Sequence, residues 1–355
     1  MNLKKHLTIA LSLMVLSFSC SNDDDDNTQP EPKGTYENGI FVVNQGNFGQ
    51  GNGSVSFISN DFSVSENTIF SNVNKKPLGD TAQSMAFYGD FAYIVVNYSQ
   101  KIEVVNRYTF ESVATIDSGL DNPRYMIISN GKGYVTNWGD GSNPSDDFVA
   151  VINLETNSVS AKIAVEEGPD QIISNENTIY VAHAGGYNQN NIVSVIDPNS
   201  NEITTTITVG DVPNSMVFDK QGLLYVLSGG IPDWKENETA GKLSIVNTVN
   251  NTISSTLEFE EGQHPSYLAF DESVYYYLNN EVFELAVGSS KLPGTSKIKD
   301  VNFNYMTVNN GVLYGVDAGN YTSNGTLHSF DLTTNLEKNS TDVGFIPGAI
   351  YFTAQ

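Results

Sequence analysis

A short motif recurs along almost the whole sequence, and it constrains the fold more than any other feature. In its fullest copy the apolar segment Tyr134-Val135-Thr136-Asn137 runs directly into the glycine-rich stretch from Trp138 to Gly141. Seven copies begin at aromatic residues that lie 39 to 52 positions apart: Phe41, Tyr93, Tyr134, Tyr180, Tyr225, Tyr275 and Tyr314. A repeat of roughly 45 residues has the length of a four-stranded β-propeller blade. The spacing therefore predicts a ring of seven such blades.

One repeat illustrates the strand pattern. Apolar segments at 172–174, 179–182, 192–196 and 203–209 are separated by turn residues. This pattern predicts antiparallel hairpins, whose four strands we name A to D from the ring axis outwards. The chain starts on a strand B at residue 40 and ends on a strand A, 349–353, that has no partner in its own repeat. We expect the last strand to complete the first blade, because this closes the ring and removes two exposed sheet edges.

The sequence Tyr134-Val135-Thr136-Asn137 and its sevenfold repetition resemble the YVTN-type seven-bladed β-propellers. The resemblance covers residues 36–355 and implies an all-β ring of seven four-stranded antiparallel blades. It is specific for the fold and says little about function, because one fold carries many functions.

The N-terminal residues indicate secretion and anchoring. Residues 1–19 have a basic start and an apolar run, and the only cysteine, Cys20, follows directly. These are the parts of a signal peptide, and the position of Cys20 resembles the acceptor of a bacterial lipoprotein, whose lipid anchors a chain without a transmembrane helix. The alternative is an ordinary signal peptide with an incidental cysteine.

Residues 20–35 contain the acidic run Asp23 to Asp26 and two prolines, Pro30 and Pro32, which predicts a disordered tether. The acidic run resembles the signal that exports Bacteroidetes lipoproteins to the cell surface, and the alternative is a generic solvated spacer. Residues 36–355 remain for the propeller. The net charge of −24 argues strongly against a nucleic acid partner, since the phosphates would be repelled.

The two faces of the predicted ring differ. The B–C loops and D–A corners share one face, which we call the loop face, and the A–B and C–D turns share the turn face. The turns are mostly short and polar, whereas six of the seven B–C loops carry one large aromatic residue. With residues near the D–A corners they form the predicted ligand-binding set: Phe48, Tyr98, Arg124, Tyr125, Asn137, Trp138, His183, Tyr187, Trp234, Tyr267, Tyr305 and Tyr321.

Exposed rings and arginines are frequent anchors of binding surfaces. Within this set, the expected stacking walls are Trp138, Tyr187, Trp234 and Tyr321, and the expected polar contacts are Arg124 and Asn137. The alternative is that the rings only pack the loops against one another.

Signs of catalysis are weaker. Of the four histidines, only His183 and His264 fall where they could reach the loop face, and His183 is better explained as a hydrogen-bonding residue. The acidic loop residues match no calcium-binding spacing, and nucleophile-elbow and phosphate-loop motifs are absent from the sequence. We therefore expect no catalytic residues, no metal and no cofactor.

A tethered propeller with an aromatic face resembles the cobalamin-capturing surface lipoproteins of the BtuG type. The resemblance implies capture of a corrinoid on the loop face, transfer to a TonB-dependent transporter in the outer membrane, and membrane contact through the lipid alone. Two other classes stay open. One is a protein- or glycan-binding surface propeller, and the other is a propeller enzyme of the lactonase or quinoprotein type.

Overall fold

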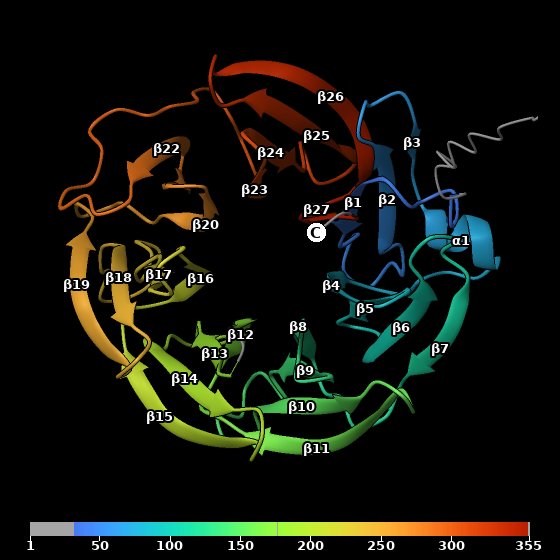
Figure 1. Cartoon of the computed structure of the whole chain (residues 1–355), viewed down its shortest axis with the longest axis horizontal. Coiled ribbons are helices and arrows are strands. Elements are labelled where there is room, and N and C mark those ends of the chain that lie inside the picture. The colour runs from blue at the N-terminus through green and yellow to red at the C-terminus, as the bar shows by residue number, and fades with distance from the viewer. Residues whose placement is uncertain (1–31, 176, 354–355) are drawn as a thin grey trace, which may run out of the picture. The chain divides into compact units, whose positions relative to one another are not determined.

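The computed structural model describes residues 32–175 and 177–353, which form seven antiparallel sheets around one axis (Figure 1). The predicted all-β, seven-bladed propeller is confirmed. Among the described residues the only helix is α1 (Ile69–Asn74), and none is long and apolar enough to cross a membrane. The predicted signal peptide, with Cys20 and most of the predicted tether, lies outside the described residues.

Within each blade the strands follow one another from strand A, nearest the axis, outwards. Blade 1 contains β27 (Pro347–Phe352), β1 (Gly39–Asn44), β2 (Ser54–Ser59) and β3 (Ser65–Glu66). Blade 2 contains β4 (Ala82–Tyr88), β5 (Phe91–Val96), β6 (Lys101–Asn106) and β7 (Ser112–Ile116). Blade 3 contains β8 (Pro123–Ser129), β9 (Lys132–Asn137), β10 (Phe148–Asn153) and β11 (Ser158–Ala164). Blade 4 contains β12 (Pro169–Ser174), β13 (Ile179–His183), β14 (Ile192–Asp197) and β15 (Glu202–Thr208).

Blade 5 contains β16 (Pro213–Phe218), β17 (Leu224–Ser228), β18 (Lys242–Asn247) and β19 (Thr252–Glu258). Blade 6 contains β20 (Ser266–Asp271), β21 (Val274–Asn279) and β22 (Glu281–Ala286). Blade 7 contains β23 (Tyr305–Asn309), β24 (Val312–Asp317), β25 (Asn324–Asp331) and β26 (Leu336–Phe345).

The ring closes as the sequence predicts. The last strand, β27, pairs antiparallel with β1, with Ile350 opposite Val42 (Figure 1). Just beyond β27, the hydroxyl oxygen of Thr353 accepts a hydrogen bond of 2.8 Å from the backbone N–H of Gly39. Joining the two ends of the propeller in one sheet covers the inner edge of β1 and closes the ring.

Blade 6 departs from the pattern of the other blades. Its outer strand is reduced to a single bridge between Val282 of β22 and Ile298. Its B–C loop is reduced to Asn280, because β21 and β22 follow one another with a single residue between them. The loop face is therefore interrupted at this blade.

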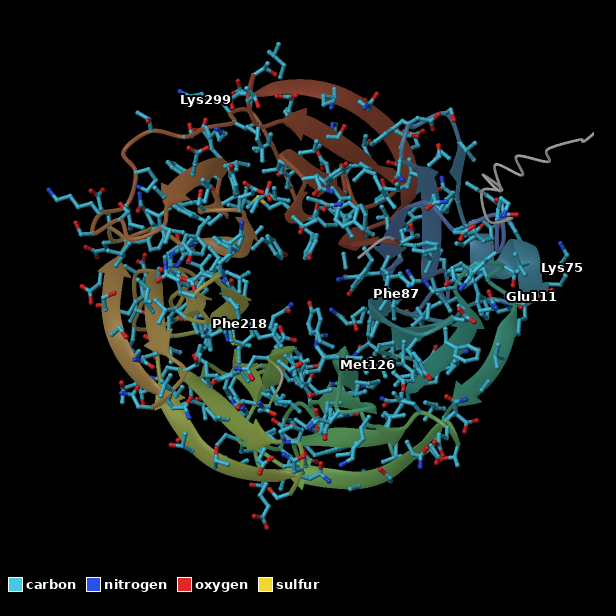
Figure 2. All side chains as sticks on the ribbon, viewed as in Figure 1. Lys75, Phe87, Glu111, Met126, Phe218 and Lys299 are labelled. Carbon is cyan, nitrogen blue, oxygen red and sulfur yellow. The ribbon has the colours of Figure 1, made fainter. Side chains whose placement is uncertain are left out.

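Each blade is buried on both faces, because it packs against two neighbours. Side chains of the strands fill the spaces between blades, and Phe87, Met126 and Phe218 lie towards the centre (Figure 2). Lys75 and Lys299, which are outside the strands, lie at the periphery (Figure 2). Consequently all four residues of the motif Tyr134-Val135-Thr136-Asn137 in β9 have no exposed surface, although alternate residues of a strand point to opposite faces.

The tyrosine that begins the repeat links neighbouring blades. In blades 2 to 4 its hydroxyl donates to the side-chain oxygen of an asparagine in the C–D turn of the next blade. The pairs are Tyr93 with Asn157 (3.3 Å), Tyr134 with Asn201 (3.0 Å) and Tyr180 with Asn251 (3.2 Å). Each of these asparagines has a positive φ, a backbone conformation that asparagine tolerates better than most residues. The motif tyrosine is thus part of the scaffold.

Candidate functional site

Three of the four predicted stacking residues meet at one cavity. Trp138, Tyr187 and Trp234 come from the B–C loops of blades 3, 4 and 5, and they line a cavity of about 340 Å³ that we call the aromatic pocket. They include both tryptophans of the chain. The polar residues that line it are Asp170, Asn188, Gln189 and Lys235. The pocket therefore combines large rings with amide and charged groups.

Trp138 is held in place by its neighbours. Its indole N–H donates to the backbone oxygen of Pro169 at 2.9 Å. The guanidinium carbon of Arg124 lies 3.9 Å from the centre of the indole ring, close enough for a cation–π interaction. Arg124 also donates to the carboxylate of Asp170 at 3.0 Å. The structure thus places Arg124 against Trp138 as a support, and its contact with a ligand stays a prediction.

Tyr187 and Trp234 are much more exposed than Trp138. Tyr187 packs edge-to-face against Trp138, with ring centres 6.4 Å apart. A Cβ atom on Gly141 would lie only 2.6 Å from the ring of Tyr187, so the close approach of this ring requires glycine at that position. The ammonium group of Lys235 lies 5.1 Å from the ring of Trp234 and donates to the backbone oxygen of Tyr187 at 3.2 Å.

The remaining loop aromatics lie elsewhere on the loop face. Phe48 and Tyr98 form a separate pair between blades 1 and 2, with ring centres 4.4 Å apart. Tyr321, in blade 7, accepts a hydrogen bond of 2.9 Å from Asn304 through its hydroxyl. Tyr321 does not line the aromatic pocket, so its role as a stacking wall stays a prediction for another part of the loop face. The one-residue loop of blade 6 separates it from Trp234.

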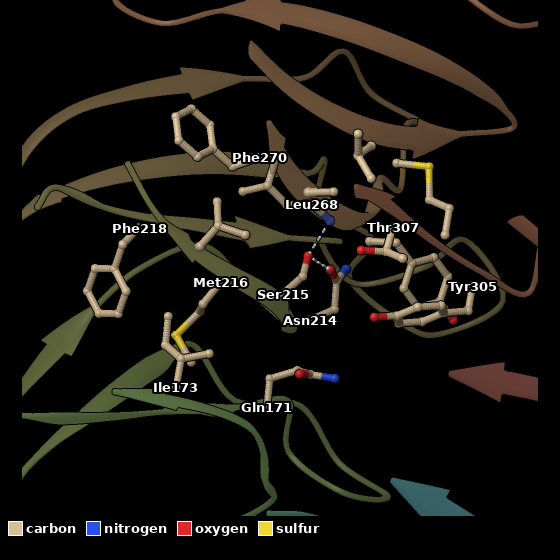
Figure 3. Close-up of a pocket in the computed structure, with 15 residues that line it drawn as sticks. Gln171, Ile173, Asn214, Ser215, Met216, Phe218, Leu268, Phe270, Tyr305 and Thr307 are labelled. Carbon is tan, nitrogen blue, oxygen red and sulfur yellow. Dashed lines mark hydrogen bonds between the residues drawn. The ribbon is translucent and has the colours of Figure 1, made fainter. Parts of the chain in front are cut away.

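Tyr125, Tyr267 and Tyr305 were expected near the corners of the loop face. They belong instead to strand A of blades 3, 6 and 7. Tyr267 and Tyr305 line a cavity of about 680 Å³ between the A strands of blades 4 to 7, which we call the axial cavity (Figure 3). Burial raises the pKa of Tyr267 to about 12 and also raises the pKa values of Tyr125 and Tyr305, so these phenols are protonated at neutral pH.

Asn137 and His183, the last residues of β9 and β13, are fully buried. The side-chain oxygen of Asn137 accepts from the backbone N–H of Asp121 at 2.9 Å. His183 Nδ1 lies 2.8 Å from the backbone oxygen of Glu166, and its Nε2 lies 2.9 Å from the hydroxyl of Ser194. Burial lowers the pKa of His183 to about 4, so the ring is neutral. The prediction that these two side chains face a ligand is wrong, because both belong to the scaffold.

Polar residues occupy one repeated position of strand A, and of these only Arg124 was predicted from the sequence. The second residue of strand A is polar in four consecutive blades, and these residues are Gln83, Arg124, Asp170 and Asn214. Arg124 donates hydrogen bonds to the residues at this position in both neighbouring blades, to Gln83 at 3.1 Å and to Asp170 at 3.0 Å. Three of the four follow a corner proline, and this local signal could have identified them. Within 32–175 and 177–353, no group of three or more His, Cys, Asp or Glu residues could hold a metal ion.

The fold and this site define a seven-bladed β-propeller whose loop face is aromatic and asymmetric. Residues 38–274 match the family described as a domain of unknown function, DUF5074, and the chain belongs to this family. No curated protein shows significant sequence similarity to the chain.

Several solved structures share the architecture. Hydrazine synthase from Kuenenia stuttgartiensis has a TM-score of 0.60 at 15% identity, covering 89% of this chain and 98% of that one. A quinonprotein alcohol dehydrogenase-like protein from Bacteroides thetaiotaomicron has a TM-score of 0.63 at 13% identity, covering 90% and 79%. BamB from Moraxella catarrhalis has a TM-score of 0.55 at 12% identity, covering 87% and 84%. At these identities the likeness shows the fold alone.

Proposed function

We propose that this chain is a non-catalytic surface lipoprotein that captures a large molecule, best a corrinoid such as cobalamin, on its loop face. The observation that carries the proposal is the convergence of Trp138, Tyr187 and Trp234 from three consecutive blades on one pocket. Two of these rings are more than two-thirds exposed, at 67% for Tyr187 and 74% for Trp234. Adjacent exposed rings are typical of surfaces that bind a partner or ligand.

The size and chemistry of the pocket support a ligand that is only partly enclosed. Its volume of about 340 Å³ is near the lower end of small-molecule sites, which span roughly 300–1,000 Å³. A corrinoid is larger than this space, so it would rest one face of its macrocycle on the rings and extend over the neighbouring loops. The amide groups around the macrocycle would meet Asn188 and Gln189 at the rim.

Anchoring and transfer are further parts of the proposal. They rest on Cys20 and the acidic run that follows it, together with the resemblance to BtuG-type proteins. The proposed partner is a TonB-dependent transporter of the outer membrane, to which the loop face delivers its ligand. Affinity capture from outer-membrane extracts, with the tagged protein as bait, tests this part: recovery of such a transporter supports it, and recovery of polysaccharide alone contradicts it.

Calorimetric titration of the purified protein with cyanocobalamin tests the ligand. We expect saturable binding with one site per chain, and the absence of saturable heat at micromolar protein would refute the corrinoid assignment. Metal analysis of the same preparation tests the non-catalytic assignment. A stoichiometric transition metal or calcium would contradict it and favour a propeller enzyme.

A further inference from the structure

We propose that the axial cavity is a second binding site, separate from the aromatic pocket, for a small neutral molecule rich in hydroxyl groups, such as a mono- or disaccharide. This inference does not rest on the proposed capture of a corrinoid. It follows from the lining of the cavity, the strain of one lining residue and the absence of charge among the lining residues.

The axial cavity has the size and polarity of a small-molecule site. Its volume of about 680 Å³ lies within the range of roughly 300–1,000 Å³ found for such sites. Gln171 from β12 and Asn214 from β16 extend into it, opposite Tyr305 from β23 (Figure 3). The side chain of Gln171 makes no hydrogen bond to any residue that the structure describes, so both its donor and its acceptor groups remain for a ligand.

Asn214 is fixed in position by its surroundings. Its amide N–H donates to the backbone oxygen of Pro265 at 2.8 Å. Its oxygen accepts from the hydroxyl of Ser215 at 2.9 Å (Figure 3). The same hydroxyl accepts from the backbone N–H of Leu268 at 2.9 Å. One N–H and one lone pair of the Asn214 amide are left over by these bonds. The amide is therefore oriented before a ligand arrives, which lowers the entropic cost of binding.

Tyr267 carries backbone strain at the wall of the cavity. Its φ is +55°, which costs a bulky side chain on the order of 1–2 kcal/mol. In five other blades the positive φ falls on the residue just before strand A, namely Thr81, Asn122, Gly168, Val212 and Ile346. In blade 6 it falls inside the strand, where the register shifts between Ser266 and Ala269.

Two phenols meet at this wall of the cavity. The rings of Tyr267 and Tyr305 meet edge-to-face with centres 5.3 Å apart, although they come from different blades. Strain of this kind persists where the surroundings impose it, and it is concentrated at ligand sites. The pair offers an aromatic surface and two hydroxyl groups to the cavity.

The cavity carries no charge to bind an ion. None of its lining residues has a charged side chain, and its two phenols are protonated at neutral pH, with pKa values that burial raises further above the ordinary value of a tyrosine. The nearby Arg124 and Asp170 neutralise each other at 3.0 Å. Placing a charged ligand in such a space would leave its charge without a partner. Rings, amides and hydroxyls together suit the apolar faces and hydroxyl groups of neutral sugars.

The test uses the whole purified protein and ligand-observed NMR with glucose, galactose, mannose, ribose, maltose and trehalose, and glucuronate and glucosamine serve as charged comparisons. We expect at least one neutral sugar to bind saturably, and the charged analogues to bind at least tenfold more weakly. Failure of all the neutral sugars to bind, or equal binding of the charged analogues, would overturn the proposal.

Variants locate the site. Tyr267→Phe keeps the ring and removes the hydroxyl, and Gln171→Leu removes the free amide; each should weaken sugar binding at least fivefold. Tyr98→Phe, a matched hydroxyl deletion on the loop face, and Trp234→Ala should leave it unchanged. Loss of sugar binding in Trp234→Ala with retention in Tyr267→Phe would contradict an axial site. Because cyanocobalamin is titrated separately, either proposal can fail while the other stands.

Discussion

Tyr180 and Tyr187 lie seven residues apart in the same repeat, and the structure uses them in opposite ways. Tyr180 lies in β13, has no exposed surface and donates to Asn251 of the next blade. Tyr187 lies in the following loop, is 67% exposed and lines the aromatic pocket. Tyr180 thus links two blades, whereas Tyr187 lies largely in solvent. Stability should therefore depend on strand aromatics such as Tyr180 and binding on loop aromatics such as Tyr187.

The largest difference should appear when each tyrosine is truncated. Tyr180→Ala removes a buried ring and its hydrogen bond, and we expect a loss of about 3–5 kcal/mol in unfolding free energy. Tyr187→Ala removes an exposed ring, and we expect a change within about 0.5 kcal/mol. Chemical denaturation of both variants measures the difference. Equal destabilisation would remove the distinction between the two groups.

A second prediction concerns His183, a titratable residue that is buried at the end of β13. His183 has a pKa of about 4 in the folded protein, below the ordinary value of 6.5, because burial disfavours its charged form. The unfolded chain takes up this proton first, so folding stability is lost as the pH falls from 6.5 towards 4. Between pH 7 and pH 5 this loss is about 2 kcal/mol.

His183→Gln removes the titration and keeps a polar group near Ser194. Between pH 7 and pH 5 the free energy of unfolding should fall by about 2 kcal/mol less in the variant than in the unchanged protein. Asp147 acts in the opposite direction, because burial raises its pKa to about 6 and favours its protonated form in the folded state. Both proteins contain Asp147, so the comparison isolates His183, and parallel pH profiles would refute the assignment.

A smaller effect on stability should distinguish the tyrosines that hydrogen-bond to the next blade from other strand tyrosines. Tyr134→Phe removes the hydroxyl that donates to Asn201, and we expect a loss of about 1 kcal/mol. Tyr314 is the matched control, because its hydroxyl makes no hydrogen bond to any described residue, and Tyr314→Phe should be nearly neutral. Thermal unfolding of the two variants measures this difference in stability. A larger effect at Tyr314 would show that the inter-blade bonds contribute little.

The smallest effect concerns Arg124, which packs against Trp138. Arg124→Lys keeps a positive charge beside Asp170 and loses the flat guanidinium that covers Trp138. We expect cyanocobalamin affinity to fall by a few-fold, about 0.5–1 kcal/mol, because the indole becomes less well held. A total loss of binding would show that Arg124 contacts the ligand directly.

The sequence was sufficient for the architecture. The repeat spacing and the unpaired strands at 40–44 and 349–353 predict seven blades and their closure, and both are confirmed by the pairing of β1 with β27. The convergence of Trp138, Tyr187 and Trp234 follows from the adjacency of their blades. Tyr321 fails to join them because the loop of blade 6 is a single residue, a local deletion that the repeat pattern hides.

The positions of Asn137, His183 and the strand A residues could not be predicted from the sequence. Asn137 and His183 precede exposed loops, but blades pack on both faces and bury the strand up to its last residue. Strand A is harder still, because its alternation is broken by register shifts, such as that between Pro123 and Met126 in blade 3. Which of its side chains reach the axial cavity is set by those irregularities and by the strained Tyr267.

The most direct test compares two loop aromatics that are almost equally exposed. Trp234 is 74% exposed and lines the aromatic pocket, whereas Phe48 is 72% exposed and lies on blade 1 beside Tyr98. Calorimetric titration of Trp234→Ala and Phe48→Ala with cyanocobalamin separates position from exposure. We predict an affinity loss of at least tenfold for Trp234→Ala, about 1.4 kcal/mol or more, and less than twofold for Phe48→Ala. Equal losses in the two variants, or no loss in Trp234→Ala, would contradict a binding site at the aromatic pocket.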